Sequence, residues 1–96
     1  MGLQTVPIGE RHALQISSAP GGWELRVISE KTEPLGSIVV TPQQMIRLVR
    51  RGITITQLPL EVRGLKWEIE FRDNNVLVGR VRKDDFLLAV GIVPPG

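Results

Sequence analysis

An internal repeat is the feature that most constrains how this 96-residue chain can fold. At an offset of forty-four positions, Trp23–Val27 (WELRV) aligns with Trp67–Phe71 (WEIEF), and Leu14–Ile16 aligns with Leu58–Leu60. After short gaps, Leu35–Ile38 and Met45–Val49 align with Val78–Val81 and Phe86–Val90. The gaps fall where turns are expected, so the sequence predicts a duplicated unit, with repeat one over residues 1–52 and repeat two over residues 53–96.

Each repeat is predicted to be rich in strands. Trp23, Leu25 and Val27 alternate with charged residues, as do the corresponding residues of repeat two, and this period of two is typical of a strand with one buried face. Turn residues at positions 20–22 and 73–75 bound these strands. Further strands are expected at residues 12–17, 36–40, 60–63 and 76–82. Residues 3–8 and 53–57 are candidates for one more strand in each repeat, which leaves three or four strands per unit.

A helix is predicted to close each repeat. Thr41, Pro42 and Gln44 form a capping-box pattern, and Gly52 can end the helix that follows. Its apolar face is predicted to consist of Met45, Ile46, Leu48 and Val49, whereas Arg47, Arg50 and Arg51 point away from the core. The second helix is expected to begin with Asp84 and Asp85 at its positive end and to stop at Gly91. The predicted fold class is therefore α+β: one domain over residues 1–96, with two tandem β3–4α repeats packed as a pseudo-dimer of antiparallel sheets and two helices.

Composition argues against several classes of function. The chain has no cysteine, which excludes disulfides, thiolate catalysis and cysteine-ligated metals. His12 is the only histidine, so a metal site built on paired histidines is impossible. No glycine-rich phosphate loop is present, because the Gly21-Gly22 pair belongs to a hairpin turn. We therefore expect a protein that is not an enzyme and that needs no cofactor or metal. No apolar run is long enough to cross a bilayer and no secretory signal is recognisable, so a soluble, cytoplasmic protein without a membrane partner is expected.

The two tryptophans allow two interpretations. Trp23 and Trp67 are in phase with the apolar residues of their strands, and this phase favours a place in the core. The outer sheet face would then carry Glu24, Arg26, Glu68, Glu70 and Arg72, a mixed-charge surface without rings. The alternative is that the rings lie on the surface and stack on unpaired bases.

Basic residues are concentrated in the second half of the chain. From Arg47 onward nine basic residues face six acidic ones, whereas three basic and four acidic residues precede it. Arg80 and Arg82 share one face of a predicted strand, about 7 Å apart, a spacing comparable to that of phosphates along a nucleic-acid strand. The candidate nucleic-acid-binding residues are Arg80, Arg82, Lys83, Arg72, Lys66 and Arg26. The same charges are also explained as an ordinary solubilising surface.

The order of elements resembles a known group of proteins. The strand at Gly22–Val27, a return strand and the helix at Thr41-Pro42, repeated once along the chain, are similar to the Whirly, Pur-alpha and transcriptional-coactivator group of single-stranded-DNA-binding proteins. The resemblance spans residues 3–90, and it implies two β4α units whose helices pack together behind curved sheets. It rests on topology and duplication, so it assigns no functional residues to this chain.

Two hypotheses for function follow. In the first, a small non-enzymatic, transcription-associated protein uses the basic sheet edge at Arg80, Arg82 and Lys83 to follow the phosphates of single-stranded DNA or RNA. In the second, the chain is a protein-interaction or assembly module with no role in nucleic-acid binding. Its partner would either pair one of its own strands with an exposed sheet edge or contact the apolar tail at Gly91–Pro95.

Overall fold

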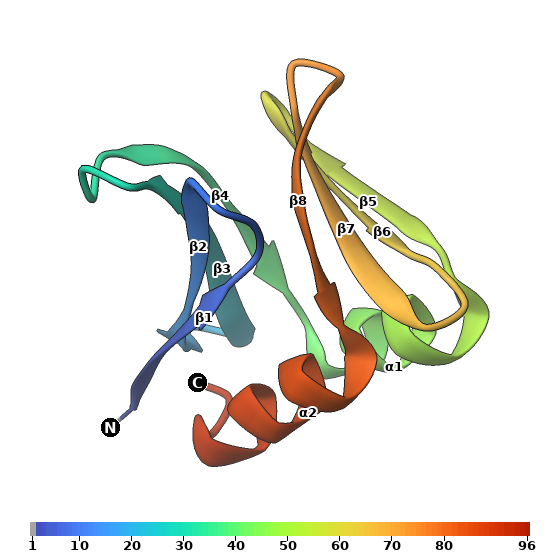
Figure 1. Cartoon of the computed structure of the whole chain (residues 1–96). Helices are drawn as coiled ribbons and strands as arrows, with labels where there is room; N and C mark the ends of the chain where they lie inside the picture. Colours follow the sequence, from blue (N-terminus) through green and yellow to red (C-terminus); the bar gives the residue numbers. More distant parts are fainter. Residues whose placement is uncertain (1) are drawn as a thin grey trace.

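The computed structural model describes residues 2–96 and consists of two four-stranded sheets and two helices (Figure 1). The elements in chain order are β1 (Leu3–Pro7), β2 (His12–Ala19), β3 (Gly22–Ser29), β4 (Pro34–Val40), α1 (Pro42–Arg51), β5 (Thr54–Gln57), β6 (Leu60–Gly64), β7 (Glu68–Asp73), β8 (Val76–Arg82) and α2 (Lys83–Ile92). The predicted α+β class is confirmed, and each repeat contains four strands. Among the described residues, no helix is long and apolar enough to cross a membrane.

Both sheets are antiparallel meanders with the strand orders β1-β2-β3-β4 and β5-β6-β7-β8. They share an unusual detail of register. The pairing of β3 with β4 shifts between Val27 and Ile28, and the pairing of β7 with β8 shifts between Phe71 and Arg72. These positions are related by the same offset that aligns the two tryptophan strands. A register shift at equivalent positions of the two repeats is expected if the repeats are copies of one unit.

Strand pairing corrects one part of the predicted alignment between the repeats. Leu14 pairs with Val27 in the first sheet, and Val62 pairs with Phe71 in the second. Leu14 therefore corresponds to Val62, and the predicted match of Leu14–Ile16 with Leu58–Leu60 is wrong. Leu58 lies in the turn between β5 and β6, where it is exposed.

The cause of this misalignment is a shortened hairpin in repeat two. Nine positions separate Ile16 from its cross-strand partner Leu25, whereas five separate Gly64 from its partner Ile69. Repeat two thus lacks four residues at the tip of the β6–β7 hairpin. As a result Trp67 lies in the connecting turn rather than in a strand.

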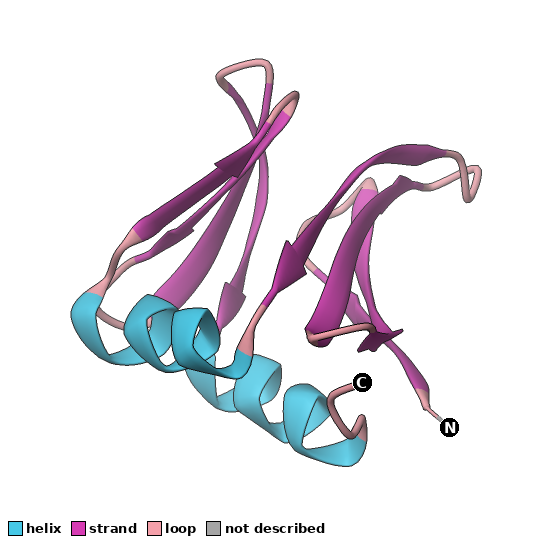
Figure 2. Cartoon of the chain, turned by 180° about the vertical axis from the view of Figure 1, so that it is seen from behind, coloured by secondary structure: helices cyan, strands magenta, loops and turns pink. Residues whose placement is uncertain are grey.

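A single hydrophobic core fills the space between the two sheets. The alternation of apolar and polar residues turns one face of each sheet inward, and the buried side chains there are Leu14, Ile16, Leu25, Val27 and Ile38 from the first sheet and Leu60, Val62, Ile69, Phe71 and Val81 from the second. The helices lie across one end of the sheets (Figure 2). They close that end with Met45 and Leu48 of α1 and with Phe86, Ala89 and Val90 of α2.

The helix starts differ from each other. In α1 the predicted capping box is present: Gln44 N donates to Thr41 Oγ1 at 3.1 Å, and Thr41 N donates to Gln44 Oε1 at 2.9 Å. In α2 the N-cap is Arg82, whose side chain makes no capping bond, and Asp84 and Asp85 lie in the first turn. The two carboxylates therefore favour the helix through its dipole and do not cap it. Ile46, predicted to belong to the apolar face of α1, is exposed.

The two sheets are also joined along their edges. On one side the Gln57 side chain pairs with the backbone of Val39, accepting from its N–H at 3.1 Å and donating to its carbonyl at 3.0 Å. On the other side Arg80 N donates to the Ile8 carbonyl at 2.6 Å. These contacts satisfy backbone groups that a sheet edge would otherwise expose.

The apolar tail folds back onto repeat one. Trp23 Nε1 donates to the Val93 carbonyl at 2.7 Å, Gly96 N donates to the Gly22 carbonyl at 2.8 Å, and Ser18 Oγ donates to the Pro94 carbonyl. Val93 is fully buried in the core. Within the tail at Gly91–Pro95, predicted as a docking surface, Val93 is thus buried and the Val93 and Pro94 carbonyls bond to the chain's own β2–β3 hairpin, whereas Gly91, Ile92, Pro94 and Pro95 are exposed.

The join at Ile8 leads to a first prediction. A Cβ at Gly79 would overlap the Ile8 carbonyl oxygen, whereas a Cβ at Gly36, the corresponding residue of repeat one, would make an ordinary contact with Leu60 Cβ at 3.5 Å. We expect Gly79→Ala to lower the free energy of unfolding by about 1–3 kcal/mol because the sheets must separate locally. Gly36→Ala should be neutral or stabilising by up to about 1 kcal/mol. Urea unfolding measures the change in the free energy of unfolding for each variant. Equal changes would contradict a close contact between Gly79 and the Ile8 carbonyl.

Candidate nucleic-acid interface

The six cations predicted as a binding site lie in three places. Arg72, Arg80 and Arg82 lie on the outer face of the second sheet. Lys66 and Lys83 lie at the end of that sheet nearest the helices. Arg26 lies on the first sheet, where it forms an ion pair with Glu24 at 3.3 Å. The structure therefore does not bring Arg26 together with the other five.

Charges of opposite sign alternate across the outer face of the second sheet. One row of cross-strand neighbours runs from Thr54 through Arg63 and Glu70 to Arg80. In the adjacent rows Glu61 faces Arg72 and Glu68 faces Arg82. Each arginine of this face thus has a carboxylate as a cross-strand neighbour, an arrangement that stabilises the sheet and reduces its positive potential.

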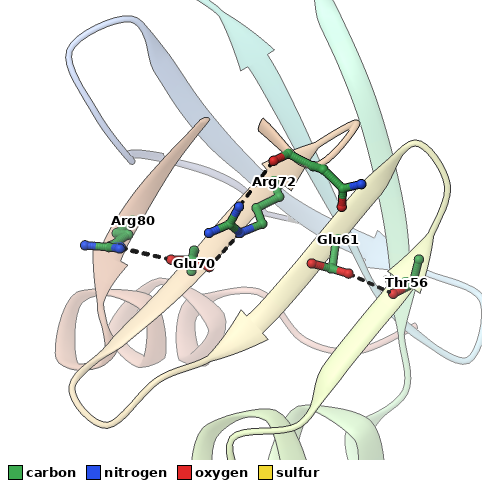
Figure 3. A network of polar contacts seen from close by, with 6 residues as sticks. Thr56, Glu61, Glu70, Arg72 and Arg80 are labelled. Carbon is green, nitrogen blue, oxygen red and sulfur yellow. Dashed lines mark hydrogen bonds and ion pairs between the residues drawn. The ribbon is translucent and has the colours of Figure 1, made fainter. Parts of the chain in front are cut away.

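Glu70 is the centre of this network (Figure 3). Its carboxylate accepts from Arg72 Nε at 3.0 Å and from Arg80 Nε at 3.1 Å. Arg72 also donates to the Asn75 carbonyl at 3.2 Å, which holds its side chain along the sheet. The two arginine side chains cover Glu70 so that it is only 3% exposed. Glu70 therefore lies on the outer sheet face, as predicted, but it is not exposed to solvent there. Alternation along a strand predicts which side of the sheet a residue occupies and does not predict whether neighbouring side chains cover it.

The electrostatics of this network bear on the predicted site. The hydrogen bond from Arg72 lowers the pKa of Glu70, and so does the bond from Arg80, whereas burial opposes this shift. The net pKa is below its ordinary value, so the carboxylate is ionised at neutral pH. Arg72 and Arg80 are then already paired with an anion and would have to leave it to bind a phosphate. The part of the outer sheet face around Glu70 is thus a poor surface for nucleic acid.

A second group of cations lies where α1, the β6–β7 turn and the start of α2 meet. We call this group the cationic end; it comprises Arg50, Arg51, Lys66, Arg82 and Lys83. Four of these residues, all except Arg82, line one shallow hollow together with Gly52, Gly64 and Leu65. No acidic residue lines this hollow. Within residues 2–96, the ion pairs involve Arg26, Arg72 and Arg80 and none of the cations of this end.

Backbone packing brings these cations together. A Cβ at Gly64 would overlap the Leu48 carbonyl oxygen, so only glycine lets the β6–β7 turn approach the end of α1 this closely. Gly52 ends α1 in the left-handed conformation, at φ 66°. Lys83 N donates to the Trp67 carbonyl at 2.9 Å, and Lys83 Nζ donates to the Val49 carbonyl at 2.7 Å. These bonds connect all three segments of the cationic end.

Trp67 projects from this same place. Its side chain is 73% exposed, and Lys66 Nζ lies 5.5 Å from the centre of its ring, a distance typical of a cation–π contact. Trp23, by contrast, is buried beneath the tail. The prediction of a core position is confirmed for Trp23 and wrong for Trp67. The shortened β6–β7 hairpin places Trp67 in a turn instead of a strand, and the tail that covers Trp23 lies over repeat one and not over Trp67.

The structure places Trp67, Arg50 and Arg51 beside the predicted residues Lys66 and Lys83. The two arginines were recognisable as a cluster in the last turn of α1, but only folding brings them next to Lys66. No group of three or more metal-ligating side chains occurs within residues 2–96. Comparison of the chain with models of protein families, with curated protein sequences and with solved structures found no match. Function must therefore be inferred from the geometry of the site.

The Glu70 network gives a second prediction. Glu70→Gln should lower the free energy of unfolding at pH 7 by about 1–2 kcal/mol, because two charge-assisted hydrogen bonds become weaker ones with partners that are partly exposed. Glu68→Gln changes a residue on the same face of β7 that has no ion pair within residues 2–96. This control should change stability by less than about 0.5 kcal/mol.

The effect of Glu70→Gln should also depend on pH. The pKa of Glu70 is lower in the folded chain than in the unfolded chain, where glutamate titrates near about 4.3. Its stabilising effect is therefore complete above that value and is lost as the pH falls through the folded-state pKa. Urea unfolding should show the wild type and Glu70→Gln differing equally from pH 7 to about pH 5 and converging below about pH 4. A difference that does not change down to about pH 2 would contradict this assignment.

Proposed function

We propose that this protein binds single-stranded nucleic acid at the cationic end, with Trp67 stacking on an unpaired base and the surrounding cations contacting phosphates. The observation that carries this proposal is the exposed Trp67 ring beside a group of cations that form no ion pair within residues 2–96. A large exposed aromatic side chain beside arginine and lysine is the combination used by proteins that bind single strands without reading sequence.

The energetics favour Trp67 as the main anchor. Stacking of one base on an aromatic side chain contributes about 1–3 kcal/mol, whereas the Lys66 cation–π contact at an exposed site contributes about 0.5–1 kcal/mol. A base can therefore replace the lysine on the ring at a net gain. The released Lys66 ammonium then lies close to the phosphate of the stacked nucleotide. Bases in a duplex already stack on one another, so this mode of binding favours single strands.

The cations differ in how free they are to bind. Lys83 donates to the Val49 carbonyl, and Arg50 and Arg51 lie in the last turn of α1, whose partial negative charge they offset. Lys66 and Arg82 are exposed and have no ion pair within residues 2–96. We therefore assign the direct phosphate contacts first to Lys66 and Arg82, with the other three cations raising the local positive potential.

This site differs from the basic sheet edge inferred from sequence. It keeps Lys66, Arg82 and Lys83, adds Trp67, and excludes Arg26, Arg72 and Arg80, which are paired with carboxylates. The order of four strands and a helix, present twice, resembles the Whirly and Pur-alpha group of single-stranded-DNA-binding proteins. The resemblance supports the class of ligand, and the choice of residues rests on the geometry alone.

Removal of the ring gives a third prediction. Trp67→Ala should weaken binding of labelled single-stranded DNA or RNA by roughly 5- to 150-fold, the equivalent of about 1–3 kcal/mol of stacking. Fluorescence anisotropy measures the affinity. Because Trp23 is buried and Trp67 is exposed, stacking should also quench the tryptophan fluorescence of a Trp23→Phe variant that remains folded.

The salt dependence of binding separates phosphate contacts from stacking. For single strands each phosphate contact contributes about 0.7 to the slope of log affinity against log salt. Replacing Lys66 and Arg82 with glutamine should therefore reduce the slope by about 1.4, whereas Trp67→Ala should leave it nearly unchanged. Arg26→Gln, on the other sheet, is the matched control and should alter neither affinity nor slope. Absence of binding at low salt, or equal effects of Arg26→Gln and Trp67→Ala, would refute the proposed site.

A further inference from the structure

The edge of β1 is left open by the rest of the chain. The edges of β4 and β5 contact each other through Val39 and Gln57, and the edge of β8 contacts Ile8 through Arg80 N. Within residues 2–96, no hydrogen bond joins the backbone of β1 to any element other than β2. Apart from Pro7 at its end, β1 has neither the charged side chains nor the bulge that usually protect such an edge. A further strand can therefore pair with β1.

The register of β1 shows which of its backbone groups face this open edge. Ile8 N donates to the His12 carbonyl at 3.2 Å, and antiparallel strands alternate between residue pairs that exchange hydrogen bonds and pairs that do not. The backbone of Val6 is therefore directed toward β2, whereas the N–H and carbonyl of Thr5 are directed away from it. Pro7 fits the same alternation, because its position needs no N–H for β2.

A groove follows this edge where β1 and α2 lie side by side (Figure 1). Its volume is about 340 Å³, and it is lined by Gln4, Thr5, Val6, Pro7, Asp85, Leu88, Ala89 and Ile92. The helix contributes an apolar wall, in which Leu88 and Ile92 are 69% and 55% exposed. Asp85 is the one charged residue of the lining, and it forms no ion pair within residues 2–96. The groove thus fits an apolar side chain beside a cation.

The spacing of these groups matches that of an extended chain. A Cβ at Gly2 would lie 3.3 Å from Val93 Cγ2, so β1 begins where α2 ends and Asp85 lies at the far end of the groove. The midpoint between Leu88 and Ile92 is five residues from Asp85, or about 7.5 Å along the helix axis. Alternate side chains of a strand are about 7 Å apart. One side chain can therefore lie against the two apolar residues while the next on the same face reaches the carboxylate.

We propose that the β1 edge binds an extended segment of a partner protein with the pattern basic–x–apolar, paired antiparallel to β1. Residue x lies opposite Thr5 and exchanges two backbone hydrogen bonds with it. An antiparallel segment runs in the same direction as α2, so the basic side chain comes first, at Asp85, and the apolar one follows, at Leu88 and Ile92. A second copy of β1 does not fit this groove, because β1 has no cation to place at Asp85.

Fluorescence anisotropy without nucleic acid tests this inference, with the full chain titrated to about 1 mM into a labelled peptide TTKTVTT whose ends are blocked. The wild type should bind this peptide. N-methylation of the central threonine, whose N–H faces Thr5, should weaken binding at least about tenfold because it removes one hydrogen bond and blocks close approach. N-methylation of the valine, whose N–H faces away, is the matched control and should change binding less than about twofold. Absence of binding at about 1 mM, or equal effects of the two methyl groups, would overturn the inference.

Variants of the chain locate the site. Asp85→Lys should weaken binding of TTKTVTT at least about fivefold, and a peptide with glutamate in place of lysine should bind this variant better than it binds the wild type. Asp84→Lys makes the same change one residue away, outside the groove lining, and should have less than half that effect. Trp67→Ala should bind the peptide like the wild type, which separates this site from the cationic end. Equal effects of the two aspartate variants would overturn the assignment.

Thr5→Pro removes the N–H at the centre of the open edge. Proline is tolerated on edge strands where the N–H faces solvent, so β1 should keep its place, as circular dichroism can check, while peptide binding is lost. Sedimentation velocity distinguishes the other occupant. A wild type that associates with itself, and does so no longer as Thr5→Pro, would identify a second copy as the strand that pairs with β1 and would overturn the inference.

Discussion

The close approach of Gly64 to the end of α1 is the contact on which the asymmetry of this molecule depends. With any side chain at Gly64, the β6–β7 turn would be pushed away from the Leu48 carbonyl. Without that approach, Lys66 would not share a hollow with Arg50 and Arg51. The Trp67 carbonyl, which holds the start of α2 through Lys83 N, belongs to the same turn. One backbone contact therefore sets the geometry of the cationic end and the position of the second helix.

Repeat one differs from repeat two at the hairpin that corresponds to β6–β7. There the β2–β3 hairpin is four residues longer, and the chain after α2 lies over it. Trp23 is buried as a result, with its indole N–H satisfied by the Val93 carbonyl, as a buried tryptophan requires. In repeat two the chain turns at Gly52 into β5 and covers no such hairpin. The same framework thus buries one tryptophan and leaves the other exposed.

Local patterns were sufficient to predict the fold class but not the site. Alternation places Leu25, Val27, Ile69 and Phe71 correctly, and the capping box at Thr41 correctly marks the start of α1, because both depend on residues close in sequence. The exposure of Trp67 depends on the length of its hairpin, which is visible only once strand register is known. The burial of Glu70 depends on Arg80, a cross-strand neighbour ten positions away. The periodicity of the sequence predicts neither feature, because both depend on residues that come together only in the folded chain.

The distribution of charge shows why a count of basic residues misleads here. On the sheet, Glu70 neutralises part of the charge of Arg72 and Arg80, and these residues contribute mainly to the stability of β7 and β8. At the end of α1, by contrast, Arg50 and Arg51 partly offset the helix dipole, Lys66 lies beside the exposed Trp67 ring, and none of these cations forms an ion pair within residues 2–96.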